Sequence, residues 1–421
     1  MKHVVIVGAG FAGLNAAKQL ANQDGISVTL LDRENHHVFQ PLLYQVATAA
    51  LSPAEIAAPI RGILSSARNI RVLMAEAKEI KLQERIVESS VGPIHYDYLL
   101  IACGATHAYF GHDEWEAYAP GLKTLPQATE IRARILKAFE AAENSTDAAQ
   151  QRTQLTFVVI GGGPTGVELA GALGEMSRYT LARDFRRIDP RLARIILIEA
   201  GPRILPAFSE KISAIAVRNL ESLGAQVWVN ARVTDISENT LRVGGETLQA
   251  GTTLWAAGVH ASTIAASLNV ETDRAGRVVV TDQLTLKDDN QVFVLGDMSC
   301  CMDTKTNRPL PGTADVAMQQ GIYVGKAIID DLQERARQPF HYKYLGQFAA
   351  IGRGRALYEA GRFHLSRHFA WWFWLLLHIY RLTGFRNRII VLIQWAWSYW
   401  TYGRGARLIV SRDWRQFPEK N

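Results

Sequence analysis

The sequence has little of what disulfide-rich, zinc-binding or membrane-spanning proteins are built from. It contains only three cysteines in 421 residues and no C-x-x-C pair, so it indicates neither a disulfide framework nor a structural zinc site. No apolar run reaches the roughly 18 residues of a spanning helix. The first residues lead straight into a strand pattern, so we expect no signal peptide, no bound metal and a reducing, cytoplasmic compartment.

Excess positive charge is also absent from most of the chain. The net charge is +6, but residues 353–415 hold eleven arginines against two acids, a net +9, so the remainder carries −3. Seven of the ten tryptophans lie in the same part. No nucleic-acid-binding motif accompanies these arginines. We therefore expect a separate basic, aromatic module at this end and no nucleic-acid partner.

What the sequence does contain is a dinucleotide-binding pattern at its N-terminus. The apolar run Val4–Val7 predicts a buried parallel strand, and Gly8, Gly10 and Gly13 follow it as G-x-G-x-x-G before a helical pattern. Such glycines form a tight turn and let a pyrophosphate approach the helix N-terminus. Asp32 ends the next strand, where an acid binds ribose hydroxyls. Strand, turn, helix and acid together predict a bound dinucleotide.

The same pattern recurs in the middle of the chain. Gly161, Gly163 and Gly166 follow a second apolar strand, and Glu199 ends the strand after it. A carboxylate at this place favours the free ribose of NADH and repels the 2′-phosphate of NADPH. Arg203 is close in sequence and would weaken that preference. Two such patterns predict two bound dinucleotides.

The remaining strands indicate how the two halves are arranged. A short strand ends in Gly296-Asp297, and the segments 99–105 and 253–258 read as strands that complete each nucleotide-binding sheet. We expect an α/β fold with two Rossmann-like domains, each with a three-layer sheet, and a helical C-terminal region. The expected boundaries are 1–120 and 281–335 for the first nucleotide-binding domain, 121–280 for the second, and 336–421 for the C-terminal region.

At this point the chain resembles the type II NADH dehydrogenases, which are single-subunit, non-proton-pumping NADH:quinone oxidoreductases with FAD. The resemblance covers nearly the whole chain, and its most specific parts are residues 104–116 and 384–409, with further matches at 32–57, 161–173 and 292–297. It implies hydride transfer from NADH to FAD and delivery of two electrons to a lipid-soluble quinone.

The resemblance also implies the residues of the sites. FAD would contact Gly8, Gly10, Phe11, Ala12, Gly13, Asp32, Arg33, Ala77, Gly104, Asp297, Ala314 and Asp315. NADH would contact Gly161, Gly163, Gly166, Glu199 and Gly258. Glu168 would lie by the nicotinamide and flavin, and Asp315 and Gln319 would face the quinone together with Pro41–Tyr44. The alternative for Glu168 is a solvated acid that stabilises a helix N-terminus.

Asp315 departs from the family pattern, which has glutamine at this position. It would either donate a proton to the quinone or cap the helix that starts here, and we favour the cap. This leaves open whether the quinone is ubiquinone or menaquinone. Cys103 replaces a common threonine and is expected to be a small buried residue. His36 and His37 are expected to be structural.

The tail predicts a membrane contact without a span. Phe369–Tyr380 would extend about 18 Å as a helix, against about 30 Å for a bilayer core. A second apolar stretch, 389–402, follows a basic turn, so the pair resembles a hairpin that lies in the membrane surface. We expect residues 369–402 to bind the cytoplasmic face of the cell membrane, with a homodimer also expected. A buried helical pair or a dimer interface is the alternative.

Two other functions share the nucleotide-binding units. A soluble reductase of a ferredoxin or rubredoxin would use both dinucleotides but has no need of the aromatic tail. A non-enzymatic membrane NADH sensor would need the tail but no turnover. A disulfide reductase is excluded more firmly, because no cysteine pair lies next to the flavin motif.

Overall fold

The computed structural model describes residues 1–401, 403 and 405–410, and the chain divides into two compact units. Unit 1 consists of Met1–Val38, Ala57–Ala108 and Val259–Leu345, and unit 2 consists of Phe39–Ile56, Tyr109–Gly258 and the chain from Gly346 onward. Each unit is described by itself. Tyr402, the end of the expected membrane-contacting stretch, and residues 411–421 of the expected C-terminal region lie outside the described residues.

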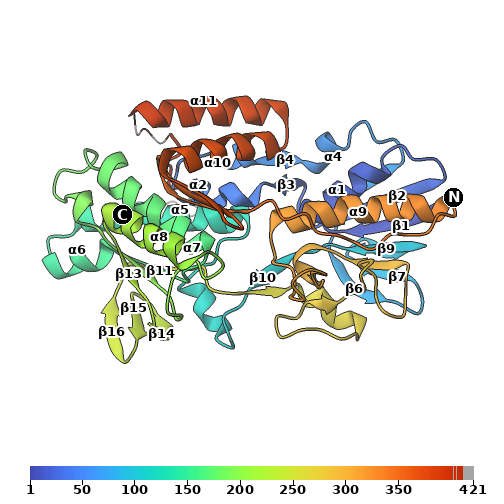
Figure 1. The fold of residues 1–421 in the computed structure, drawn as a ribbon. Helices are drawn as coiled ribbons and strands as arrows, with labels where there is room; N and C mark the ends of the chain where they lie inside the picture. Colours follow the sequence, from blue (N-terminus) through green and yellow to red (C-terminus); the bar gives the residue numbers. More distant parts are fainter. Residues whose placement is uncertain (402, 404, 411–421) are drawn as a thin grey trace, which may run out of the picture. The chain divides into compact units, whose positions relative to one another are not determined.

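Unit 1 is built on a parallel sheet with the strand order β20-β9-β1-β2-β5 (Figure 1). Its strands are β1 (Lys2–Val7), β2 (Ile26–Asp32), β5 (Ile70–Met74), β9 (Tyr98–Ile101) and β20 (Val292–Val294). Val4 and Ile6 belong to the core on one face, and Val5 and Val7 to the core on the other. The strands are apolar throughout because both faces of the sheet are covered.

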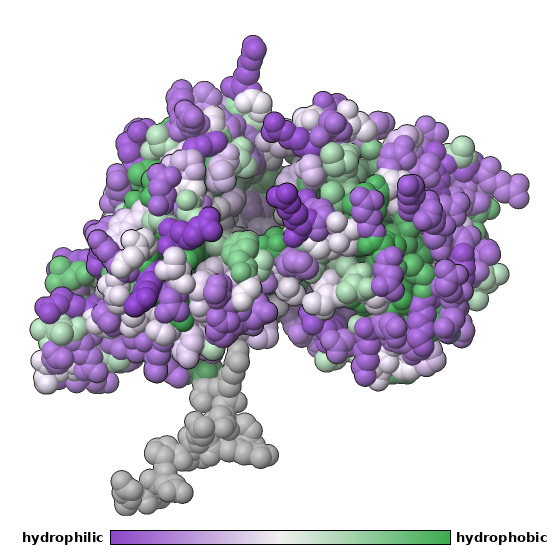
Figure 2. All heavy atoms as spheres, turned by 90° about the horizontal axis from the view of Figure 1, so that it is seen from below, coloured by the Kyte–Doolittle hydropathy of each residue, from purple (hydrophilic) through white to green (hydrophobic). Residues whose placement is uncertain are grey.

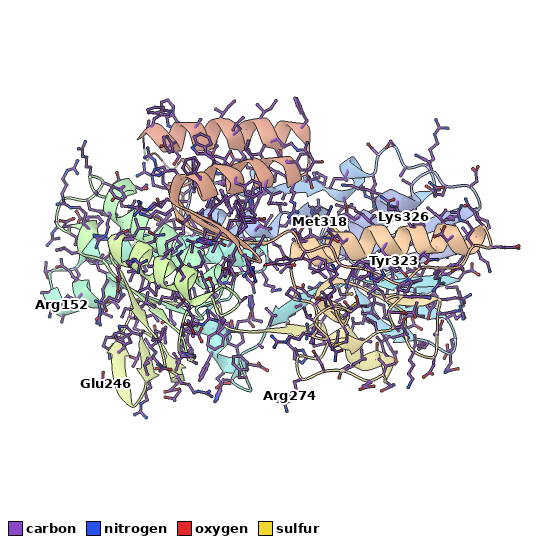
Figure 3. The ribbon with its side chains drawn as sticks, in the orientation of Figure 1. Arg152, Glu246, Arg274, Met318, Tyr323 and Lys326 are labelled. Atoms are coloured by element: carbon purple, nitrogen blue, oxygen red, sulfur yellow. The ribbon has the colours of Figure 1, made fainter. Side chains whose placement is uncertain are left out.

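Helices cover one face of this sheet and an antiparallel sheet covers the other. The helices α1 (Phe11–Leu20) and α9 (Ala314–Leu332) contribute to the first core, and β6 (Ala77–Lys81), β7 (Ile86–Ser89), β8 (Gly92–His95) and η5 (Thr263–Leu268) to the second. The two helices touch, since a Cβ at Gly321 would lie 2.1 Å from the Ala12 carbonyl oxygen. Figure 3 marks Met318, Tyr323 and Lys326 along α9. These three layers confirm the expected fold class.

Shorter elements complete unit 1. They are β3 (His36–Val38), β4 (Ala57–Pro59), α4 (Ile60–Ile63), β10 (Ala105–His107), β18 (Val259–Ala261), β19 (Val278–Val279), η6 (Gly296–Met298) and β21 (Ser299–Cys300). β10 pairs with β18 in an antiparallel ribbon. The chain therefore rejoins unit 1 at Val259, earlier than the expected boundary at residue 281.

Unit 2 repeats the parallel sheet with the order β13-β12-β11-β17. The strands are β11 (Thr156–Ile160), β12 (Arg194–Ile198), β13 (Ala225–Trp228) and β17 (Thr252–Trp255), and the surrounding helices are α5 (Leu125–Asn144), α6 (Ala148–Gln154), α7 (Pro164–Glu175) and α8 (Glu210–Ser222). An antiparallel sheet again follows, formed by β14 (Val233–Ser237), β15 (Thr240–Val243) and β16 (Glu246–Gln249). The duplicated plan expected from the sequence is therefore present.

Two further segments pack onto unit 2. The first contains η1 (Gln40–Leu42), α2 (Leu43–Ala47) and α3 (Pro53–Ile56), and α2 contacts α5 and α7. The second contains β22 (Gln347–Gly352), β23 (Arg355–Ala360), β24 (Phe363–Ser366), α10 (Arg367–Arg381) and α11 (Phe385–Thr401). β22 lies on α7 so closely that a Cβ at Gly171 would be 1.8 Å from the Ile351 carbonyl oxygen. The tail is thus part of unit 2. The short helices η2 (Asp113–Ala117), η3 (Met176–Thr180) and η4 (Pro190–Leu192) complete it.

The tail helices α10 and α11 run side by side (Figure 1). Among the described helices, none has both the length and the apolar content that crossing a membrane requires. The exposed apolar residues of α10 recur every three or four positions, at Phe369, Trp372, Phe373, Leu376 and Tyr380. Those of α11 do the same, at Phe385, Ile389, Leu392, Ile393, Trp397 and Trp400. Each helix therefore exposes one apolar stripe.

Candidate functional site

The first glycine turn connects β1 to α1 in unit 1. Gly8 has φ +101°, and a Cβ there would lie 2.4 Å from the Ala102 carbonyl oxygen. A Cβ at Gly13 would lie 1.9 Å from the carbonyl oxygen of Gly8. Gly10 is the N-cap of α1 and lacks a side-chain hydrogen bond, and a Cβ there would have only the Ala102 carbonyl oxygen within 4.0 Å. The first N–H groups of α1 are therefore available to an anion such as a pyrophosphate.

Asp32 holds this turn from the end of β2. Its Oδ2 accepts a hydrogen bond from the Ala9 N–H at 2.6 Å, and its Oδ1 accepts one from the Glu34 N–H at 2.8 Å. Burial raises the pKa of Asp32 above its usual value, although both hydrogen bonds oppose the rise. The exposed Arg33 follows it. The carboxylate thus fixes the turn and retains lone pairs for a ribose.

His37 supports the same turn, a role the sequence suggested only as structural. Its Nδ1 lies 2.9 Å from the Ala9 carbonyl oxygen, and its ring meets the Phe11 ring edge-on at 5.1 Å. Burial lowers the pKa of His37 to about 4, so the ring is neutral at neutral pH and Nδ1–H donates to the carbonyl. Ala9 is therefore held at its N–H by Asp32 and at its C=O by His37.

The second glycine turn, between β11 and α7 in unit 2, has the same construction. Gly161 has φ +109°, and a Cβ there would lie 2.6 Å from the Ala256 carbonyl oxygen. A Cβ at Gly166 would lie 1.9 Å from the Gly161 carbonyl oxygen, as at the first turn, and the space around Gly163 is open. Gly163 is the N-cap of α7, again without a side-chain hydrogen bond. This turn can receive a second pyrophosphate in the same way.

Glu199 has the role at the second turn that Asp32 has at the first. Its Oε2 accepts from the Gly162 N–H at 2.7 Å, and its Oε1 accepts from the Gly201 N–H at 2.6 Å. The guanidinium of Arg203 donates instead to the carbonyl oxygens of Pro206 at 2.8 Å and Phe208 at 2.5 Å. Arg203 is therefore engaged with backbone carbonyls.

The segment from β20 to α9 carries the other predicted contacts of unit 1. The Gly296 N–H donates to Oε1 of Gln320 at 2.6 Å, which fixes the turn that presents Asp297. Gln320 is fully buried. A Cβ at Gly312 would lie 3.0 Å from Oδ1 of Asp297. Gly312 thus leaves room for this carboxylate.

The N-terminus of α9 differs in detail from the expectation. The capping side chain is that of Thr313, whose Oγ1 accepts from the Val316 N–H at 3.4 Å, and Asp315 lies within the first turn after Ala314. Gln319 pairs with the backbone of Lys343, donating to its carbonyl at 3.0 Å and accepting from its N–H at 2.9 Å. Gln319 therefore fixes the segment that follows α9.

Three predicted positions lie apart from these contacts. Ala77 begins β6. Gly104 has φ +71°, and its carbonyl accepts from the Ser262 N–H at 3.1 Å. Gly258 in unit 2 has φ +79° and lies beneath the ring of Phe110. Phe110 had not been singled out from the sequence.

Glu168 lies on α7 in unit 2 and is half-buried. Its Oε1 accepts from the Ala350 N–H at 3.2 Å. Burial raises the pKa of Glu168 to about 8, because the single hydrogen bond only partly offsets desolvation of the charge. The carboxyl is therefore mostly protonated at pH 7, which does not fit the alternative of a solvated, ionised acid.

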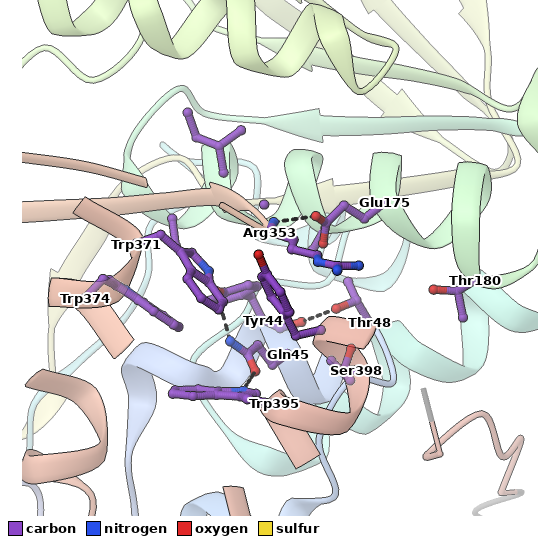
Figure 4. A pocket seen from close by; sticks show the side chains of 16 residues that line it. Tyr44, Gln45, Thr48, Glu175, Thr180, Arg353, Trp371, Trp374, Trp395 and Ser398 are labelled. Carbon is purple, nitrogen blue, oxygen red and sulfur yellow. Dashed lines mark hydrogen bonds between the residues drawn. The ribbon is translucent and has the colours of Figure 1, made fainter. Parts of the chain in front are cut away.

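Unit 2 also contains an open cavity of about 90 Å³, lined by α2, α7, β22 and both tail helices (Figure 4). The indole N–H of Trp395 donates to Oε1 of Gln45 at 2.7 Å, and the Gln45 amide donates to the Tyr44 hydroxyl at 3.1 Å. The guanidinium of Arg353 lies 4.1 Å from the Tyr399 ring centroid. The walls are thus aromatic, with a few fixed polar groups. Gln45 is a polar residue in an otherwise apolar stretch around Tyr44, and this is the feature of the sequence that could have indicated the cavity.

We expect the Glu168 carboxyl to ionise near pH 8. Infrared difference titration should show the C=O band of a protonated acid that persists at pH 7 and disappears as the pH rises through about 8. Glu168→Gln, which cannot ionise, should lack this transition. A wild-type band that disappears near pH 4.5, the usual range for glutamate, would contradict the burial argument.

Comparison with known proteins places this geometry in a family. The model of the pyridine nucleotide-disulphide oxidoreductases matches residues 2–321. The chain is 42% identical to the type II NADH:quinone oxidoreductase NdhA of Mycobacterium tuberculosis, over 97% of this chain and 89% of that protein. It is 39% identical to Ndh of the same organism, a protein that bears the same description, over 97% and 90%.

Solved structures share the fold at lower sequence identity. NDH2 from Plasmodium falciparum in complex with NADH superposes with a TM-score of 0.88 at 21% identity, covering 96% of this chain and 99% of that one. The sulfide:quinone oxidoreductase of Aquifex aeolicus superposes with a TM-score of 0.72 at 20% identity, covering 92% of both chains. Fold and sequence therefore agree, and the chain belongs to the pyridine nucleotide-disulphide oxidoreductases and, among them, to the type II NADH:quinone oxidoreductases.

Proposed function

We infer that this protein is an NADH:quinone oxidoreductase that uses FAD and does not pump protons. The observation that carries the inference is the pair of equivalent glycine turns, each held by a carboxylate, in a chain 42% identical to a type II NADH:quinone oxidoreductase. One turn suits the resident flavin cofactor and the other a nicotinamide dinucleotide. A reductase that binds a single dinucleotide would not need both glycine turns.

The residues of unit 1 fit FAD. The missing side chain at Gly10 and the uncapped first turn of α1 suit a pyrophosphate, and Asp32 suits a ribose. We propose that Phe11, Ala12 and Gly13 offer backbone N–H groups, and that Asp297, Gly104 and the N-terminus of α9 contact the rest of the cofactor. Bound FAD supplies the chemistry of accepting a hydride and passing on two electrons.

The residues of unit 2 fit NADH better than NADPH. Glu199 places negative charge beside the glycine turn, where a 2′-phosphate would have to bind. Arg203 was the residue that would have weakened this preference, and its guanidinium donates to backbone carbonyls. We propose that Gly161, Gly163, Gly166 and Gly258 receive the remainder of the dinucleotide.

Carboxyl groups on two helices are proposed to handle protons. Glu168 has a pKa of about 8 and so can give up or take a proton near neutral pH. Asp315, in the first turn of α9, is proposed as the second group, since Thr313 supplies the cap that we had favoured for it. We propose that Gln319 acts indirectly. Its hydrogen bonds to the backbone of Lys343 fix the segment that follows α9.

The cavity of unit 2 supports the proposal of a quinone-binding site. A quinone ring is flat and apolar with two carbonyl acceptors, and aromatic walls with a few fixed polar groups suit such a ligand. Tyr44, already implied by the family resemblance, belongs to the lining together with Gln45 and Trp371. We propose that this cavity admits the acceptor beside the tail helices.

The two stripes on α10 and α11 support membrane contact. Exposed apolar patches of this extent mark interaction surfaces. The face drawn in Figure 2 is mainly hydrophilic, with hydrophobic patches among the polar side chains. Arg381 and Arg386, near the turn between the helices, suit anionic lipid head groups. We propose that the protein binds the cytoplasmic face of the cell membrane through this tail, as a homodimer.

The alternatives are less well supported. A soluble ferredoxin or rubredoxin reductase would leave the exposed stripes without a role. A non-enzymatic sensor would not need a carboxyl whose pKa lies near physiological pH. Sustained turnover with quinone distinguishes the enzyme from both.

The purified protein should be yellow and should oxidise NADH with ubiquinone and menaquinone analogues. NADPH should be oxidised at least about tenfold more slowly, because Glu199 repels the added phosphate. Absorbance at the flavin bands and NADH consumption with and without quinone measure this. A protein without flavin, or one that reduces ferredoxin but not quinone, would refute the proposal.

Filling the cavity should impair quinone use selectively. Ser398→Phe places a ring in the cavity, so the KM for a quinone analogue should rise about tenfold while the rate with ferricyanide, a water-soluble acceptor, stays unchanged. Ser66→Phe, at an exposed serine of unit 1, is the control. Equal loss with both acceptors would mean that the substitution damages the protein generally.

A charge on the apolar stripe should release the protein from membranes. Ile393→Glu introduces a carboxylate at a position 61% exposed, so cosedimentation with anionic vesicles should fall several-fold. The matched control is Val91→Glu, 60% exposed on the β7–β8 turn, which should sediment as wild type does. Unchanged binding of both variants would place the membrane contact elsewhere.

A further inference from the structure

The loop that enters unit 2 carries an exposed ring in an unfavourable backbone conformation. Phe110 has φ +56° and is 71% exposed. The left-handed region is costly for bulky residues, and a strained residue that persists in a fold points to a function. The neighbouring aromatics are anchored: Tyr109 donates to the Ala119 carbonyl at 2.9 Å, and His112 stacks on Trp115 at 4.2 Å. Phe110 is 71% exposed, compared with 42% for Tyr118 in the same loop.

The ring has a definite position on the sheet. A Cβ at Gly258 would lie 2.6 Å from Cζ of Phe110, so the ring covers the glycine that follows β17. It also lies 6.2 Å from the Trp255 ring at the end of that strand. The backbone between these two residues touches the glycine turn, because a Cβ at Gly161 would meet Ala256 at 2.6 Å. Phe110 thus lies at the carboxyl edge of the sheet, where dinucleotides bind in this fold.

The strand order indicates which half of the dinucleotide is involved. Glu199 directly follows β12, whereas Gly258 follows β17, and these strands flank β11 on opposite sides. An acid at the end of the second strand binds the adenosine ribose, and the pyrophosphate lies on the turn after the first. The nicotinamide half then extends toward β17.

We propose that Phe110 is a binding residue for the nicotinamide half of NADH, with its ring packed against the nicotinamide riboside above Gly258. The proposal rests on the proposed function, because it takes NADH as the ligand of unit 2. The exposed ring is buried when the ligand binds, and the left-handed backbone at Phe110 holds it in place beforehand. Such packing between rings contributes about a three- to tenfold change in affinity.

Titration calorimetry with two ligands tests this on the full-length flavoprotein. In Phe110→Ala the Kd for NAD⁺ should rise about three- to tenfold, while the Kd for ADP-ribose, which lacks nicotinamide, should stay within about twofold. Phe110→Tyr keeps the ring and should restore NAD⁺ affinity. Phe110→Gly removes the ring and relieves the backbone, so it should match Phe110→Ala. Phe363→Ala, an exposed phenylalanine on β24, should leave both ligands unaffected.

The possible outcomes distinguish a failure of the proposal for Phe110 from a failure of the proposed function. Unchanged NAD⁺ affinity in both Phe110→Ala and Phe110→Gly would overturn the contact. An equal loss for NAD⁺ and ADP-ribose would overturn its assignment to the nicotinamide half. Wild-type protein that binds neither ligand would instead refute the proposed function.

Discussion

The whole site depends on how closely the backbone approaches itself at two glycine turns. At Gly13 and Gly166 a Cβ would lie 1.9 Å from a carbonyl oxygen, a distance that no side chain tolerates. This approach brings the start of each helix against the preceding strand and exposes the helix N–H groups to an anion. The carboxylates of Asp32 and Glu199 then fix the middle residue of each turn. In each unit the glycine turn and its carboxylate therefore lie together at the carboxyl edge of the parallel sheet.

The sequence was sufficient for these parts because their chemistry is local. Apolar strands, glycine spacing and an acid at the end of the next strand are all read along the chain, and the three-layer fold class was confirmed. The nucleotide-binding residues implied by the family resemblance lie in separate units: Gly8–Gly13, Asp32 and Asp297 in unit 1, and Gly161–Gly166 and Glu199 in unit 2.

Other features could not be read from the sequence because they depend on contacts between distant segments. Phe39–Ile56 packs with unit 2 since α2 lies against α5 and α7, although the segment sits between strands of unit 1. Nothing in the sequence distinguishes Gln320 from its neighbour Gln319, yet its buried amide oxygen accepts a hydrogen bond from the Gly296 N–H. The pKa of Glu168 depends on burial beneath β22, which lies about 180 positions later in sequence. The left-handed backbone of Phe110 had no signature in its residue type.

The tail shows the same limit. Its tryptophans did not form a clean stripe in the sequence, because three neighbouring indoles cannot share one helical face. In the structure Trp374 is buried and Trp372 is exposed, and together with their apolar neighbours they divide into an inward and an outward set. Polar contacts from Gln394 to Glu55 and from Trp395 to Gln45 fix the inward side of α11 onto unit 2.

That division gives the tail two spectroscopic populations of indole. Trp374 and Trp395 lie 5.1 Å apart, and the N–H of Trp395 is already bonded within the protein, so their emission reports on the interior of unit 2. Trp397 and Trp400 point outward and have no such internal bond among the described contacts. Under the proposed membrane contact, quenchers carried on lipid chains would reach the second pair and not the first. The emission of the second pair would then report on membrane docking, and that of the first pair on internal packing.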